Sequence, residues 1–146
     1  MFGNRICTVV LAGLIGLACA RAPEQEDANL SRQAIADRDW ELVALGDQAD
    51  PLGAGGRRPT MRFTAADTSA GGFTGCNRWS SKYTMSGSAL TFAPAISTKM
   101  ACTEGMELET AFLAMIAQVR QYEATDSTLT LLANDAPLAR FRVAAP

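Results

Sequence analysis

The cysteines are the side chains of this sequence with the clearest chemical potential. The chain has four cysteines and no histidine, which excludes Ser-His-Asp and Cys-His catalysis and any His-ligated metal site. Cys76 and Cys102 lie in the part of the sequence that is predicted to fold, and they do not form a Cys-x-x-Cys motif. In an exported protein such a pair favours a structural disulfide, with two buried thiols or a redox pair as the alternatives. We expect no metal and no cofactor.

Acidic and nucleophilic side chains show no catalytic arrangement. Glu104, Glu107 and Glu109 have helical spacing, and we interpret them as the solvated start of a helix. No nucleophile, base and orienting group are spaced as a catalytic set, so the sequence predicts a protein that is not an enzyme. The net charge of −2 excludes a basic surface for nucleic acid.

The N-terminal segment has the pattern of an export signal. Arg5 precedes an apolar run over residues 6–17, which is shorter than the roughly 20 residues needed to span a bilayer. Ala18-Cys19 at its end resembles a bacterial lipobox, so residues 1–18 are predicted to be removed and Cys19 to carry a lipid. Ala20 favours the outer membrane, with the protein facing the periplasm. The alternative is cleavage after Ala20, which would leave a soluble periplasmic protein.

The remaining sequence divides into a tether and one domain. Residues 19–37 are polar and are predicted to form a flexible tether, and residues 38–146 are predicted to fold. Alternating apolar and polar residues predict short strands, separated by Gly-, Pro- and Asp-rich turns. The clearest of these strands are expected around Trp40–Ala44, Met61–Phe63, Phe73–Asn77, Lys82–Met85, Leu90–Phe92, Leu129–Leu131 and Ala139–Val143.

A single segment has helical periodicity. Between about residues 104 and 121, apolar side chains recur at helical spacing and should face the sheet. These side chains are Leu108, Phe112, Met115, Ile116 and Val119. The sequence therefore predicts a mainly β domain with one packed helix, in which an antiparallel sheet curls into a small partial barrel that the helix closes.

Two short motifs carry a family resemblance. Gly75-Cys76-Asn77-Arg78-Trp79-Ser80 and the later run Ser97-Thr98-Lys99-Met100-Ala101-Cys102 resemble, in order, the two signatures of META/HslJ domains. Trp40, Tyr83 and the closing pair of strands also agree with the family. The resemblance implies a small β-rich domain with one helix, a location in the cell envelope, and links to stress tolerance and antibiotic resistance. It implies no established reaction.

The signature residues have two possible roles. Asn77, Thr98 and Arg78 are expected to stabilise a turn, because an Asn side chain readily bonds to nearby backbone. The alternative is an interaction patch of Arg78, Trp79, Tyr83 and Lys99, since cationic and aromatic residues are enriched in interfaces.

These observations predict a non-enzymatic envelope protein that acts by protein interaction. Its expected partner is an envelope protein that the sequence does not identify, its contact with the membrane is the lipid on Cys19, and the domain is expected to be monomeric. The alternative function is that of a small β-barrel carrier of a hydrophobic ligand, or of a pilotin-like escort lipoprotein.

Overall fold

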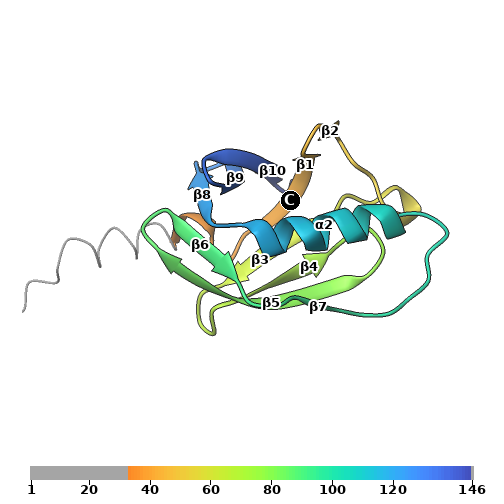
Figure 1. Ribbon diagram of the computed structural model, residues 1–146, viewed down its shortest axis with the longest axis horizontal. Coiled ribbons are helices and arrows are strands. Elements are labelled where there is room, and N and C mark those ends of the chain that lie inside the picture. The colour runs from red at the N-terminus through yellow and green to blue at the C-terminus, as the bar shows by residue number, and fades with distance from the viewer. Residues whose placement is uncertain (1–32, 146) are drawn as a thin grey trace, which may run out of the picture.

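The computed structural model describes residues 33–145 (Figure 1). The predicted signal peptide, the predicted lipidation site Cys19 and residues 19–32 of the predicted tether lie outside the described residues. The folded part begins earlier than the sequence suggested. Ile35, which we assigned to the tether, is 1% exposed, and its carbonyl oxygen accepts a hydrogen bond of 3.0 Å from Trp40 Nε1. No helix in residues 33–145 is long and apolar enough to cross a membrane.

Eight antiparallel strands close into a barrel, which confirms the predicted fold class. Their order around the barrel is β1, β3, β4, β5, β6, β8, β9 and β10, and the pairing of β10 with β1 completes the ring. Two-residue strands β2 (Gln48–Ala49) and β7 (Ile96–Ser97) and the 3-10 turn η1 (Ala54–Gly56) are additions to it. The barrel strands are β1 (Asp39–Leu45), β3 (Thr60–Thr64), β4 (Ser69–Phe73), β5 (Arg78–Ser86), β6 (Ala89–Phe92), β8 (Gln121–Ala124), β9 (Thr128–Ala133) and β10 (Ala136–Val143).

Strand β5 shows how the alternating pattern positions side chains. Its burial alternates strictly along nine residues, with Trp79 and Tyr83 pointing into the barrel and Arg78 pointing to solvent. The predicted strand at Phe73–Asn77 is wrong. The chain leaves β4 at Phe73 and bends before β5, because Gly75 has a φ of 122° that a continuous strand does not permit.

The helix α2 (Met106–Gln118) is shorter than predicted. It begins after Gly105, whose φ of 87° lies in the left-handed region, and it stops where Val119 becomes extended before β8. The prediction of its inner face is confirmed, since the five predicted apolar side chains are all at most 7% exposed. They are Leu108, Phe112, Met115, Ile116 and Val119.

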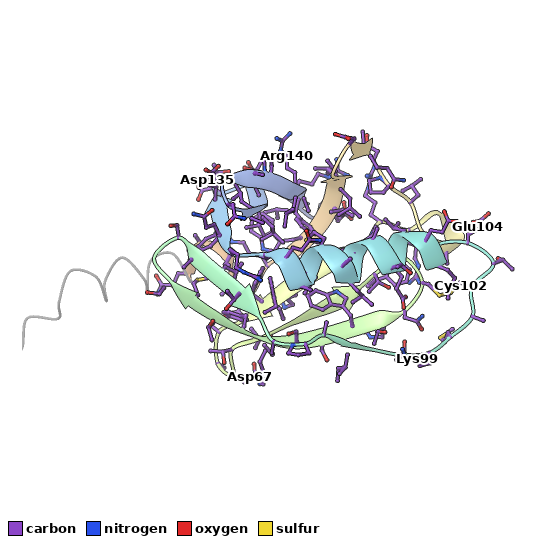
Figure 2. All side chains as sticks on the ribbon, in the orientation of Figure 1. Asp67, Lys99, Cys102, Glu104, Asp135 and Arg140 are labelled. Atoms are coloured by element: carbon purple, nitrogen blue, oxygen red, sulfur yellow. A yellow bond between two sulfur atoms is a disulfide. The ribbon has the colours of Figure 1, made fainter. Side chains whose placement is uncertain are left out.

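The helix lies beside the shortest strand pairing of the barrel. Strands β6 and β8 share a single paired position, Ala89 with Gln121, and α2 lies over the opening beside them (Figure 1). Phe112 reaches the centre of the core, with its ring centroid 5.5 Å from that of Trp79 and 6.3 Å from that of Phe141. Side chains fill the space between the helix and the strands (Figure 2).

Candidate functional site

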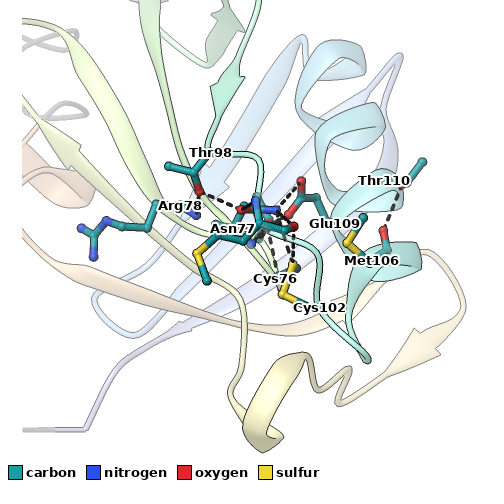
Figure 3. Close-up of a disulfide and its surroundings, with 10 residues drawn as sticks. Cys76, Asn77, Arg78, Thr98, Cys102, Met106, Glu109 and Thr110 are labelled. Atoms are coloured by element: carbon teal, nitrogen blue, oxygen red, sulfur yellow. Dashed lines mark hydrogen bonds between the residues drawn. A yellow bond between two sulfur atoms is a disulfide. The ribbon is translucent and has the colours of Figure 1, made fainter.

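The two signature motifs meet at one end of α2. The bend at Thr74–Asn77, the loop that follows β7 and the first turn of α2 lie against one another (Figure 3). Asn77 is the centre of this cluster and is 2% exposed. The structure therefore brings together most of the residues that the sequence singled out as a signature.

Every polar atom of the Asn77 side chain is used in a hydrogen bond. Its Oδ1 accepts from Thr98 Oγ1 and from the Met100 backbone N–H, each at 2.8 Å. Its Nδ2 donates to Met100 O at 3.1 Å and to Glu109 Oε1 at 3.2 Å. Asn77 thus has a structural role, but it joins the second signature to the helix instead of bonding to the nearby backbone of a turn as expected. The Oγ1 of Thr98 also accepts a hydrogen bond of 3.2 Å from the Arg78 backbone N–H, so Thr98 links two segments instead of stabilising a local turn.

Glu109 corrects the prediction of a solvated helix start. Glu104 and Glu107 are exposed as expected, but Glu109 is only 9% exposed. Its Oε2 accepts hydrogen bonds from Thr74 Oγ1 at 2.7 Å and from the Asn77 backbone N–H at 2.8 Å. These donors come from a segment more than thirty residues earlier, so local helical spacing could not reveal them.

The hydrogen bonds keep the Glu109 carboxyl ionised. Burial raises the pKa of Glu109, but the bonds from Thr74 and Asn77, together with the positive charge of Lys99, outweigh it and lower the pKa below its ordinary value. Among residues 33–145, every buried polar side-chain atom has a hydrogen-bond partner. The cluster is therefore a satisfied structural network, in which both carboxylate oxygens of Glu109 accept hydrogen bonds.

Glycines allow the three segments of the cluster to approach closely. A side-chain carbon on Gly105 or on Gly53 would overlap the carbonyl group of Gly75. That carbonyl oxygen instead accepts a hydrogen bond of 2.7 Å from the Ala54 backbone N–H. Gly53 and Gly105 lie outside the two motifs, and only their positions in the folded chain reveal this role.

The predicted disulfide is present. Cys76 and Cys102 are bonded, with their Cα atoms 5.9 Å apart (Figure 3). The bond ties the bend before β5 to the loop before α2, next to the Asn77 network. A disulfide in this place is compatible with an oxidising compartment outside the cytoplasm.

We expect Cys102→Ser to lower the free energy of unfolding by about 2–4 kcal/mol, because the open chain gains conformational entropy when it unfolds. Chemical denaturation of the variant, compared with wild-type protein with and without reductant, measures the effect. Wild-type protein in reductant should match the variant, and equal stability of all three samples would contradict the prediction.

The predicted interaction patch is not assembled. Trp79 and Tyr83 are each 4% exposed, because alternation along β5 turns both rings into the barrel. Arg78 and Lys99 remain exposed at the surface. Trp79 instead belongs to the core, where its Nε1 donates to Thr60 O at 3.3 Å.

An open groove lies on the outside of the barrel. It has a volume of about 1290 Å³ and crosses the outer face of β3, β4 and β5, with β7 and the loop after η1 contributing to its sides. Five arginines and two acidic residues line it: Arg57, Arg58, Arg62, Arg78, Arg142, Asp39 and Glu41. Sequence analysis identified only Arg78 among these, since strand register brings the others beside it. No group of three or more potential metal-binding side chains occurs in the described part of the chain.

Comparison with known proteins agrees with this fold. A family model described as the META domain matches residues 33–145. The NMR structure of a protein from Burkholderia xenovorans is 22% identical, with a TM-score of 0.66, and the match covers 94% of this chain and 100% of that one. A second NMR structure is 20% identical, with a TM-score of 0.60, and covers 76% of this chain and 92% of its own. No curated protein matches the sequence. At these identities, the structures bear on the fold alone.

Proposed function

Because the chain belongs to the META domain family, whose model spans its whole described part, we propose that it is a non-enzymatic cell-envelope protein that acts by binding another protein. The signature residues Asn77 and Thr98 support this proposal, since their side-chain polar groups are occupied in holding the fold together. The family resemblance implies links to stress tolerance and antibiotic resistance, and we include these links in the same proposal.

The packed barrel interior is the observation that carries the proposed function. Trp40, Phe63, Phe112 and Phe141 are each 0% exposed and occupy the space that a carrier would leave for its ligand. The outer groove is then our candidate surface for recognition. A carrier of a hydrophobic ligand would need α2 to leave the core, at the cost of exposing the apolar face described above.

Attachment to the outer membrane through Cys19 is part of the proposal. We expect the mature chain to begin at a lipidated Cys19, because the apolar run ends at Ala18-Cys19. Mass spectrometry of the mature N-terminus measures this directly. An unmodified chain that begins at Arg21 would replace the anchored protein with a soluble periplasmic one.

Photo-crosslinking of the intact protein in its own envelope tests the proposed function. A photoreactive phenylalanine analogue replaces exposed residues one at a time, including Ser80 in the groove and, as a control, Ser88 in the turn between β5 and β6. Binding to one partner should give a discrete protein adduct at some positions and none at Ser88. If no position gives an adduct, and the purified protein takes up a fluorescent fatty acid stoichiometrically, the carrier function replaces this one.

A further inference from the structure

We propose that the outer groove binds an acidic, extended peptide segment of the partner, and that Arg57 and Arg78 receive its carboxylates. The inference rests on the proposed function, because it identifies the surface and the chemistry through which the partner binds. It is carried by the floor of the groove, by the pairing of its arginines and by its apolar sides.

The floor of the groove is a row of paired positions that lacks large side chains at its centre. Arg62 on β3 pairs with Gly71 on β4, Gly71 pairs with Ser80 on β5, and Ser80 pairs with Ile96 on β7. Arg62 and Ser80 face outward, since their neighbours along the strands are buried. Gly71 and Ile96 share this face, because residues paired on adjacent strands lie on the same side of a sheet. The missing side chain of Gly71 and the short one of Ser80 leave a trough between Arg62 and Ile96.

Three of the five groove arginines already have acidic partners. Arg58 pairs with Asp50 at 2.8 Å, Arg62 pairs with Asp39 at 3.2 Å, and Arg142 pairs with Glu41 at 3.2 Å; these six residues form three separate ion pairs. These arginines are therefore occupied within the protein.

Arg57 and Arg78 differ from the other three. Neither forms an ion pair with an acidic residue of the described chain, and both are exposed. Both are next to Phe73: the Arg57 guanidinium is 4.0 Å from the centroid of its ring, and Arg78 is the residue paired with Phe73 across β4 and β5. A guanidinium held against a ring keeps its donors available at its edge, which suits recognition of a carboxylate.

The sides of the groove are apolar. Leu52 is 55% exposed and Ile96 is 71% exposed, and both line the groove. Large aliphatic side chains with this exposure, beside cations, provide contacts for the apolar residues of a peptide. The groove therefore offers both kinds of contact to a segment in which acidic and apolar residues alternate.

The charges favour a peptide over a polyphosphate or a nucleic acid. Asp39 and Glu41 also line the groove, where they neutralise Arg62 and Arg142. Within residues 33–145, the groove therefore offers two separate free cations rather than the continuous basic track that a polyanion favours. A peptide can place its acidic residues opposite Arg57 and Arg78 and neutral ones opposite the acids. The net charge of the whole chain is −2, so a polyanion would gain no general attraction from the rest of the molecule.

Fluorescence anisotropy with the full mature chain and a synthetic peptide tests the inference. The probe is a labelled peptide of alternating Glu and Val, about eight residues long, which spans roughly 26 Å when extended. The matched probe has Gln in place of every Glu, and inorganic polyphosphate serves as a third probe. The variants are Arg57→Gln, Arg78→Gln and Ser80→Glu, and the control is Arg140→Gln, an exposed strand arginine that does not line the groove.

The acidic peptide should bind at least about tenfold more tightly than the Gln peptide. Arg57→Gln and Arg78→Gln should each weaken it about fivefold to tenfold, Ser80→Glu should weaken it at least as much, and Arg140→Gln should leave it within about twofold. Equal loss in Arg140→Gln, equal binding of the Gln peptide, or polyphosphate binding through Arg57 and Arg78 without peptide binding would overturn the inference. A photo-adduct formed only outside the groove would also overturn it, while leaving the proposed function intact.

Discussion

Phe112→Ala is expected to lower the free energy of unfolding by about 3–5 kcal/mol, which is a large part of the stability of a domain of this size. Phe112 is 0% exposed and contacts both Trp79 on β5 and Phe141 on β10, so its removal leaves a cavity between the helix and opposite sides of the barrel. Thermal and chemical denaturation measure the loss.

A matched control lies on the same helix. Met106 is 46% exposed, and Met106→Ala should change stability by no more than about 0.5 kcal/mol. Binding of a fluorescent fatty acid is measured in parallel on wild type and both variants. A stable Phe112→Ala protein that takes up the probe would show that the helix and the barrel can separate, contrary to the packing described here.

Asn77→Asp is expected to destabilise the protein by about 3–5 kcal/mol at neutral pH, although it changes a single side-chain group. The substitution replaces an amide donor, 3.2 Å from Glu109 Oε1 and 3.1 Å from Met100 O, with a carboxylate oxygen that faces both acceptors. Chemical denaturation at a series of pH values measures the effect. Asn134→Asp, in the exposed turn between β9 and β10, is the control and should remain near wild type.

The contribution of this cluster to stability should depend on pH with opposite signs in wild type and in Asn77→Asp. In wild type, the lowered pKa of Glu109 contributes stability that is present above its ordinary pKa and disappears as the pH falls through its folded value. In Asn77→Asp, two adjacent carboxyls raise the pKa of the pair, so stability is lost as the pH rises through that raised value. The difference between the proteins should therefore shrink toward acidic pH.

A second substitution distinguishes charge repulsion from a general defect. Glu109→Gln in the Asn77→Asp background returns a donor to the pair, and we expect it to recover a substantial part of the stability at neutral pH. A difference between wild type and Asn77→Asp that stays constant with pH, or a double variant less stable than Asn77→Asp, would contradict this account of the network.

Local patterns in the sequence predicted the strands and the helix face whose burial follows from the spacing of apolar residues along the chain. Alternation identified β1, β9 and β10, and helical spacing identified the buried face of α2. Gly75-Cys76-Asn77 was predicted to continue a strand, because Phe73 and Cys76 are apolar and no local signal shows that the Asn77 side chain bonds to residues near 100 and 109. The helix was predicted to continue to about residue 121, and β8 (Gln121–Ala124) was not predicted, since pairing with β9 decides its conformation.

The candidate sites depended on information that the sequence does not carry locally. The predicted disulfide between Cys76 and Cys102 brought the two signatures together, but the sequence did not show that Glu109 joins them through partners 32 and 35 residues away. The groove depends on the register that places Arg62, Gly71, Ser80 and Ile96 in one row, and on the turn that brings Arg57 over Phe73. Composition and spacing do not determine the register of these strands, although a shift of one residue would turn the side chains to the other face. They also do not show that Arg57 lies over Phe73.

The pairing of β1 with β10 also determines the order in which the molecule can be completed. Trp40 is opposite Val143, so the first and last strands of the domain share one seam. In a chain that crosses a membrane from its N-terminus, β10 crosses last. The edge of β1 that pairs with β10 therefore stays without its hydrogen-bonding partner until then. Closure of the ring is thus a late event with a long loop-closure step, which makes folding slow for a protein of this length and leaves an exposed strand edge on every incomplete chain. Under the export that we propose for this chain, translocation and folding are coupled through the pairing of β1 with β10.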